Sequence, residues 1–111
     1  MQLTSLANIA VFGGMEFSTF RLKRNVSEAE LCTAVEQMVE GLYRDEEGFL
    51  GHALLRGADR TYVDVVFASS AARATELCTK WGTGPFAPAC LSYLEKIEED
   101  SIKLSFFQRV K

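Results

Sequence analysis

The chain has 111 residues, which is room for one domain with one hydrophobic core. Hydrophobic residues make up 48% of it, and this apolar content favours a ligand cavity or a subunit interface in addition to the core. The formal net charge of −3 argues against nucleic acid as a partner, because the 12 basic residues are scattered among 15 acidic ones and a phosphate-binding surface needs clustered Lys and Arg.

Residues 1–14 are interpreted as an N-terminal arm, and residues 15–111 as a single domain. The apolar stretch from Leu6 to Phe12 has no Lys or Arg before it and is about half as long as a membrane span. We therefore expect no signal peptide and no membrane anchor, and a soluble, cytoplasmic protein. After Gly13 and Gly14, residues 15–24 predict the first strand.

A long helix is predicted after this strand. Ser27 is a good N-cap residue, and Glu30, three positions later, completes a capping box. Val26 and Leu31 are spaced to form a hydrophobic staple around the cap. From Leu31 an apolar stripe continues at helical spacing to Leu42.

Two apolar runs, residues 49–56 and 61–68, predict a hairpin. With Ala58-Asp59-Arg60 as its loop, Arg56 lies opposite Tyr62. Ser69 or Ser70 is expected to cap a second helix that Gly82 ends.

A third helix is predicted after the loop from Gly82 to Pro85, with Pro88 in its first turn. The acidic run from Glu95 to Asp100 is interpreted as the solvated end of this helix, and residues 101–110 as the last strand. The order β-α-β-β-α-α-β predicts an α+β, ferredoxin-like domain, with helices on one face of a four-stranded antiparallel sheet.

The two faces of the hairpin differ in composition, because successive strand side chains point to opposite faces. The odd-numbered face is apolar or small apart from Thr61, so we assign it to the side under the helices. The even-numbered face mixes aliphatic and polar groups, which is typical of a cavity wall or an interface. Its members are Leu50, His52, Leu54, Arg56, Tyr62, Asp64 and Val66.

The order of elements resembles that of the dimeric α/β-barrel superfamily, which includes antibiotic-biosynthesis-monooxygenase-like domains. The segments that carry the resemblance are Gly48–His52, Tyr62–Val66 and Trp81 shortly before Pro85-Phe86. In that superfamily two subunits put their open sheet faces together and enclose a pocket. The resemblance implies a homodimer, here with Leu50, Leu54, Val66 and Phe107 at or near the interface. It does not decide function, because the superfamily hosts monooxygenases, haem-degrading enzymes, isomerases and stress proteins.

His52 and Asp64 are the candidate catalytic residues. His52, the one histidine, is a pocket acid or base in one interpretation and a strand residue satisfied at an interface in the other. Asp64 lies diagonal to it and can orient the imidazole. Arg56 and Tyr62 are candidate substrate-binding residues, since Arg56 can hold a carboxylate or enolate oxygen. Arg56 and Asp64 could equally form a structural ion pair.

Trp81 and Phe86 are expected to shape the pocket, although a helix Trp is also a common core residue. The resemblance raises a haem-degrading activity, whose pattern needs an Asn on the first strand and a His on a later helix. Here Asn25 follows the first strand and no His follows position 52. We therefore predict no haem degradation.

The sequence predicts no metal site and no cofactor. Cys32, Cys78 and Cys90 contain no close pair, and with a single His they supply no zinc ligand set. We expect free thiols in a reducing cytosol. No dinucleotide loop, phosphate loop or serine-hydrolase elbow is present.

Two functions remain open at this point. One is a small-molecule-binding dimer that acts as a cofactor-independent monooxygenase on an aromatic or polyketide-like substrate, with a small apolar or aromatic ligand in its pocket. The alternative is a non-catalytic dimeric binding or stress-response protein of the same fold.

Overall fold

The computed structural model describes residues 10–82 and 84–111, so the stretch from Leu6 to Phe12 begins outside the described residues. Within them the predicted order of strands and helices is confirmed, with a short 3-10 helix added after the second helix. In chain order the elements are β1 (Gly14–Leu22), α2 (Glu28–Leu42), β2 (Phe49–Arg56), β3 (Thr61–Ala68), α3 (Ala71–Cys78), η1 (Thr79–Trp81), α4 (Pro88–Leu94) and β4 (Ile97–Gln108).

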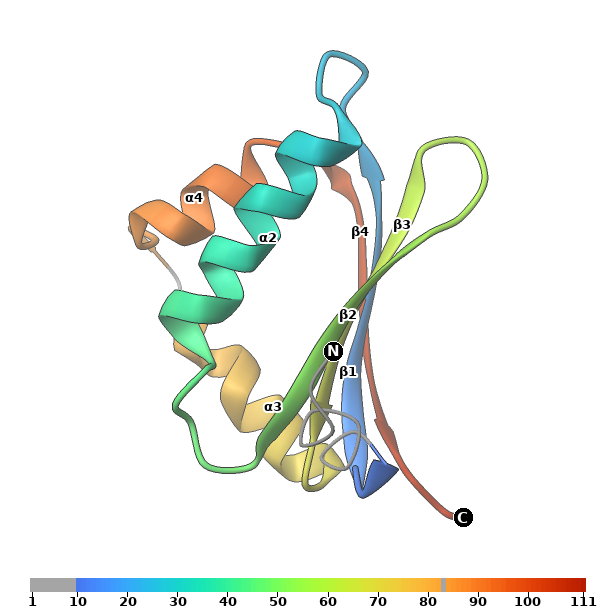
Figure 1. The fold of residues 1–111 in the computed structure, drawn as a ribbon, viewed down its shortest axis with the longest axis vertical. Coiled ribbons are helices and arrows are strands. Elements are labelled where there is room, and N and C mark those ends of the chain that lie inside the picture. Colours follow the sequence, from blue (N-terminus) through green and yellow to red (C-terminus); the bar gives the residue numbers. More distant parts are fainter. Residues whose placement is uncertain (1–9, 83) are drawn as a thin grey trace.

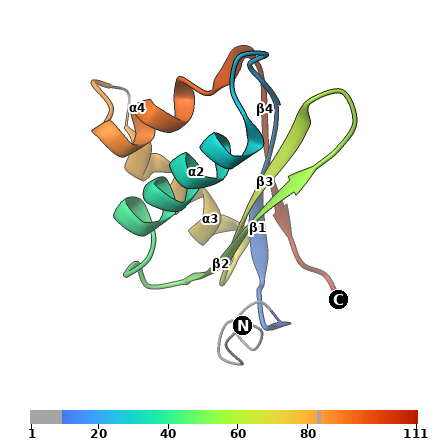
Figure 2. The same ribbon diagram turned by 45° about the horizontal axis from the view of Figure 1, so that its top comes forward.

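The strands form one antiparallel sheet in the order β2-β3-β1-β4. Helices α2, α3 and α4 lie together against one face of this sheet, and no described helix covers the other face (Figure 1). The turned view shows the same two layers (Figure 2). This is the ferredoxin-like α+β arrangement. None of the described helices is long and apolar enough to cross a membrane.

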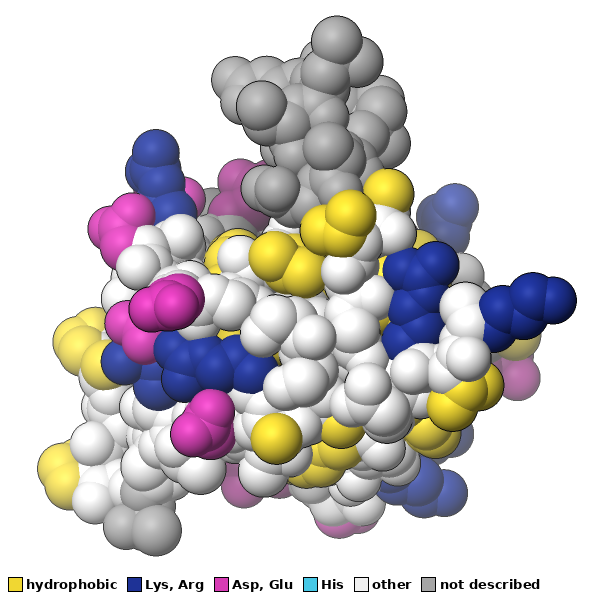
Figure 3. All heavy atoms as spheres, turned by 90° about the horizontal axis from the view of Figure 1, so that it is seen from below, with side chains coloured by type: hydrophobic (Ala, Val, Ile, Leu, Met, Phe, Trp, Pro, Cys, Tyr) yellow, Lys and Arg dark blue, Asp and Glu magenta, His cyan; other side chains and the backbone are white. Residues whose placement is uncertain are grey.

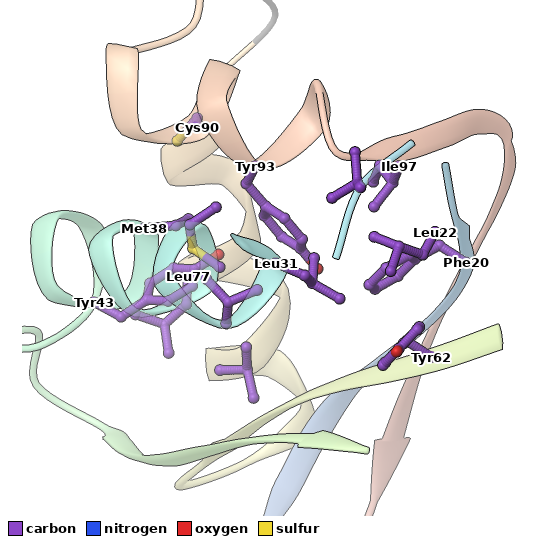
Figure 4. Close-up of a cluster of buried hydrophobic side chains, with 14 of the residues drawn as sticks. Phe20, Leu22, Leu31, Met38, Tyr43, Tyr62, Leu77, Cys90, Tyr93 and Ile97 are labelled. Carbon is purple, nitrogen blue, oxygen red and sulfur yellow. The ribbon is translucent and has the colours of Figure 1, made fainter. Parts of the chain in front are cut away.

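Helix α2 begins where its capping box predicts. The Ser27 hydroxyl accepts a hydrogen bond from the Glu30 amide, and the Glu30 carboxylate accepts one from the Ser27 amide, both at 3.1 Å. This exchange satisfies two backbone donors that the first helical turn leaves free. The buried side of α2, with Leu31 fully enclosed, then packs on the sheet among the residues labelled in Figure 4.

The hairpin register is also confirmed. Arg56 lies opposite Tyr62, Leu54 opposite Asp64 and His52 opposite Val66. The turn places Asp59 and Arg60 at positive φ, 51° and 61°, in the left-handed region. The Arg60 guanidinium donates hydrogen bonds to the carbonyl oxygens of residues 22, 23 and 26, which ties the hairpin tip to the chain before α2.

The assignment of the hairpin faces is wrong, because the even-numbered face is the one under the helices. Tyr62, Val66 and Ala68 belong to the buried cluster that includes α2 and α4, and Leu54 packs against it. Leu54 and Val66 are therefore core residues and not interface residues. The polar groups of the even-numbered face did not exclude burial, because a covered face can hold polar side chains that pair with one another, as His52 and Asp64 do.

The interpretation of the acidic run from Glu95 to Asp100 as the end of a helix is wrong. Helix α4 stops at Leu94, and β4 begins at Ile97, which pairs with Leu22 of β1 and is 2% exposed. Residues 98–100 continue the strand as half-buried or exposed side chains at the edge of the sheet. An edge strand tolerates this charge because one of its sides faces water.

The end of the molecule formed by the α2–β2 loop and the start of α3 carries charges of both signs close together (Figure 3). Arg73 of α3 lies 3.5 Å from Glu46 and 3.6 Å from Glu76, and Lys80 lies 3.3 Å from Glu46. Around this loop the charges of opposite sign therefore compensate one another.

Candidate functional site

A group of polar side chains lies on the helix-covered face of the sheet, where apolar packing is expected. Across the strands, Glu16 of β1 pairs with Val66, which pairs in turn with His52 of β2. In the neighbouring row, Ser18 pairs with Asp64. Since opposite residues share a face, the register brings Glu16, Asp64 and His52 together on one side of the sheet. Glu16 is 7% exposed and Asp64 3% exposed, so both carboxyl groups lie beneath the helices.

Asp64 is held from two directions. His52 Nε2 lies 2.6 Å from Asp64 Oδ1, and the Tyr93 hydroxyl donates a hydrogen bond to Asp64 Oδ2 at 2.5 Å. Tyr93 projects from α4 into the layer between helices and sheet (Figure 4). Burial, and then the nearby Asp64 carboxylate, raise the pKa of the Tyr93 hydroxyl well above its usual range. Tyr93 is thus a protonated donor at neutral pH, and both Asp64 oxygens have partners.

Glu16 has a different environment. Burial, and then the negative charge of Asp64, raise its pKa to about 7, although the Cys78 thiol and His52 act in the opposite direction. The thiol hydrogen-bonds the Glu16 carboxyl, and burial followed by that carboxylate's charge raises the pKa of Cys78 to about 12. Cys78 therefore stays a protonated donor at neutral pH, whereas Glu16 changes its charge near pH 7. A buried carboxyl shifted in this way is typical of functional sites.

Glu16 and Asp64 line a cavity of about 150 Å³ between the sheet and the helices. Tyr43, Trp81 and Tyr93 supply aromatic wall, and Ser18 and Cys78 add small polar groups. Leu104 of the edge strand β4 also lines it and is 47% exposed, so the cavity reaches the surface beside β4. The remaining wall is apolar: Met38, Leu94, Ile97 and Ile102.

Trp81 lies in the cavity wall because η1 carries it back over the end of α2. Its indole N–H donates a hydrogen bond to the Tyr43 hydroxyl at 2.9 Å. Burial, followed by the charge of Glu16, raises the pKa of Tyr43, which keeps this phenol neutral. Phe86 packs edge-on against Trp81, with ring centroids 6.0 Å apart, and supports the indole without lining the cavity.

The predicted site residues fall into two groups. His52 and Asp64 are in contact, and Trp81 shares the cavity with Asp64, backed by Phe86. Arg56 and Tyr62 lie instead at the start of α2. The Tyr62 hydroxyl donates a hydrogen bond to Glu28 at 2.8 Å, and the exposed Arg56 guanidinium lies 3.6 Å from the same carboxylate.

The sequence did not predict four members of this site: Glu16, Tyr93, Tyr43 and Cys78. For Glu16 a signal was available. Glu16 shares its strand face with Phe20 and Leu22, and an acidic residue on a face that continues into the core is unusual. For the other three no local pattern was available, because they reach the cavity only through the packing of α2, α3 and α4.

No protein-family model matches the chain, and no curated protein matches its sequence. Solved structures do share its fold. SnoaB, a cofactor-independent oxygenase from Streptomyces nogalater, superposes with a TM-score of 0.65 at 16% identity, over 90% of this chain and 95% of that one. A candidate antibiotic biosynthesis monooxygenase from Caulobacter crescentus gives 0.64 at 16% identity, over 91% and 93% of the two chains.

A haem-degrading protein from Mycobacterium tuberculosis superposes with a TM-score of 0.58 at 18% identity, over 91% of this chain and 94% of that one. The chain thus has the fold of the monooxygenase-like, ferredoxin-like proteins, as the sequence resemblance implies. At these identities the similarity is one of fold, and the chemistry has to be argued from the residues.

Proposed function

We propose that this protein binds a small aromatic molecule in the cavity between sheet and helices and oxidises it with O₂ as a cofactor-independent monooxygenase. The observation that carries the proposal is a mainly apolar cavity with a buried acid–base cluster in its wall. Ligand sites usually combine an apolar lining with a few convergent polar groups in this way. SnoaB, which has the same fold, is a cofactor-independent oxygenase, and this supports the proposal.

The reaction class explains why acid–base groups are needed. A ring CH₂ group and O₂ become C=O and water, so the substrate itself supplies all four electrons. The step begins when a base takes a proton from the substrate, because the resulting anion is electron-rich enough to reduce O₂. The apolar wall keeps water away from that anion. A larger ring system would extend outward past Leu104, where the cavity reaches the surface.

We propose the His52–Asp64 pair as part of this acid–base cluster. Asp64 lines the cavity, whereas His52 contacts Asp64 and is not among the lining residues. His52 accordingly acts as a positioning residue that orients the carboxylate, and Asp64 fixes the Tyr93 hydroxyl in turn. Trp81, supported by Phe86, is proposed to pack against the substrate ring.

Haem does not fit this site. The cavity of about 150 Å³ is well below the size of pockets that hold drug-sized ligands, roughly 300–1,000 Å³. Its two carboxyl groups would also repel the propionates of a haem. Among the described residues, no group of three or more His, Cys, Asp or Glu is placed to hold a metal ion.

Oxygen uptake tests the proposed function. With hydroxylated ring ketones as substrates, we expect uptake by the purified protein without added metal or flavin. Asp64→Asn should reduce turnover by about 100-fold, because it disturbs the carboxylate that holds His52 and the Tyr93 hydroxyl in the acid–base cluster, and His52→Gln should reduce it by less. Asp100→Asn, the same change at an exposed position of β4, should keep full turnover. If ligands bind but no substrate consumes oxygen, the non-catalytic binding function is the correct one.

We also propose that the protein is a homodimer formed through the open face of the sheet. Phe17 and Phe107 meet edge-on there, with centroids 6.0 Å apart, and Phe107 is 50% exposed. An exposed apolar sheet face of this kind typically marks an interface. The strand residues that the register places on this face include Met15, Phe17, Val63, Val65, Phe67 and Phe107.

Light scattering at micromolar concentration is expected to give the mass of two subunits. Phe107→Asp should shift the mass to one subunit, because it buries a charge at the centre of an apolar contact. Leu91→Asp, at a similarly exposed apolar residue of α4, should leave the dimer intact. A single-subunit mass for the native protein would contradict the proposed dimer.

A further inference from the structure

Glu16 is the carboxyl group of the cavity that has the weaker protein partners. Both oxygens of Asp64 already have partners, His52 and Tyr93. Glu16 has the Cys78 thiol, a weak donor, and lines the cavity beside Ser18. No Lys or Arg occurs among the described residues that line the cavity, so the protein itself offers Glu16 no cationic partner there.

We infer that Glu16 accepts the proton of a neutral, single-ring ligand that carries a hydroxyl group, and that it thereby selects phenols for this cavity. The inference rests on the proposed function, which requires a ligand site in this cavity. It adds the class of ligand, a phenol, and the group that accepts its hydrogen bond, the Glu16 carboxylate. A ketone whose CH₂ group lies in an otherwise conjugated six-membered ring has an enol tautomer that is a phenol, so a ketone of this type and a phenol present the same hydroxyl group to Glu16.

The size of the cavity supports a single ring. Apolar cavities of roughly 150 Å³ hold one benzene ring, and this cavity has about that volume. Tyr43, Trp81 and Tyr93 offer ring faces or edges to such a ligand. The ring hydroxyl would then point to the sheet, where Glu16 provides the acceptor.

The polar groups of the wall distinguish a hydroxyl from charged alternatives. A phenol has one proton to donate, and Glu16 satisfies it. An ammonium group would have to give up the hydration of a full charge in a mainly apolar cavity, which costs more than the desolvation of a neutral phenol. A carboxylate would meet two buried acidic groups and no cation among the described lining residues.

The protonation of Glu16 supports the same role. Its pKa of about 7 is set by burial and by the groups that face it: Asp64 of β3, His52 of β2 and Cys78 of α3. The charge of Glu16 helps to raise the pKa of Tyr43, which directly follows α2, and of Tyr93 on α4, so both tyrosines stay neutral.

During oxidation the ligand O–H bond breaks and its proton moves to the Glu16 carboxylate, which leaves a phenolate and a neutral carboxyl group. A free phenol loses its proton near pH 10, so in the resting complex the proton stays on the ligand oxygen. The hydrogen bond to Glu16 is stronger when Glu16 is ionised. Ligand affinity should therefore rise with pH through about 7.

Trp81, the one tryptophan of the chain, lines the cavity and reports binding through its fluorescence. The probes are phenol, toluene, benzoate and benzylamine, which share one ring and differ in charge and donor. Phenol should bind about tenfold more tightly at pH 8 than near pH 5.5, with a midpoint near 7. Toluene should bind without pH dependence, and benzoate and benzylamine more weakly than phenol.

Glu16→Gln should weaken phenol binding by about tenfold at pH 8 and abolish its pH dependence. Glu99→Gln, the same change at an exposed position of β4, should behave as the native protein. Cys78→Ala removes a donor that lowers the Glu16 pKa, so it should move the midpoint to higher pH and tests the inference independently.

The inference is overturned if phenol binding is independent of pH, if its pH dependence persists in Glu16→Gln, or if benzylamine binds more tightly than phenol. If toluene binds while any of these three results is found, the cavity is still a site for aromatic ligands and the proposed function is not contradicted. Phenol binding that follows Glu16, together with no oxygen uptake by any substrate, supports the inference and refutes the oxygenase activity. If none of the four probes changes Trp81 fluorescence, both proposals fail.

Discussion

Glu16→Gln is expected to raise the free energy of unfolding by at most about 3 kcal/mol at pH 8. At pH 4 the same change should leave the free energy of unfolding nearly unchanged. Folding raises the pKa of Glu16 from 4.5 to about 7, so the folded state binds this proton more tightly than the unfolded state. The stabilisation from the bound proton is complete below pH 4.5 and is lost as pH rises through about 7. Gln avoids this loss because it carries no charge at any pH.

Urea unfolding of both proteins across this pH range measures the effect. The difference in the free energy of unfolding between Glu16→Gln and the native protein should grow between about pH 5 and pH 8. Glu99→Gln should show no such growth, because Glu99 is exposed. A constant difference across the range would mean that the pKa of Glu16 is not raised by folding.

Asp64→Ala is expected to lower the free energy of unfolding by about 3–5 kcal/mol at neutral pH. The change removes the partner of two polar groups that lie beneath the helices, His52 Nε2 and the Tyr93 hydroxyl. Each would lose its hydrogen bond without gaining free access to water, which accounts for the size of the loss.

The same unfolding measurement checks this second prediction. Asp100→Ala, at an exposed position, should change stability by no more than about 0.5 kcal/mol. Tyr93→Phe should cost less than Asp64→Ala, because it removes one of the two hydrogen bonds and keeps the ring in the core. Equal effects of Asp64→Ala and Asp100→Ala would show that the buried cluster is not stabilising.

Several features of the fold followed from the sequence because they depend on residues close together in the chain. The capping box of Ser27 and Glu30 starts α2 through contacts within one turn. The hairpin register, with His52 near Asp64, follows from the length of its loop. The order of elements then restricts the topology to a ferredoxin-like sheet with helices on one face. The contact between His52 and Asp64 could be predicted for these reasons.

Other features were decided by tertiary packing. The even-numbered face of the hairpin carries polar groups, yet the helices dock on it, so Tyr62 and Val66 are covered while Phe107 of β4 stays exposed on the other face of the sheet. The cavity forms where three helices meet the sheet, and its aromatic groups come from segments far apart in the chain. The raised pKa of Glu16 arises from burial and from Asp64, which lies 48 positions away in the sequence but on the adjacent strand. Desolvation and charge proximity depend on distance in space, and the chain order of these residues does not encode them.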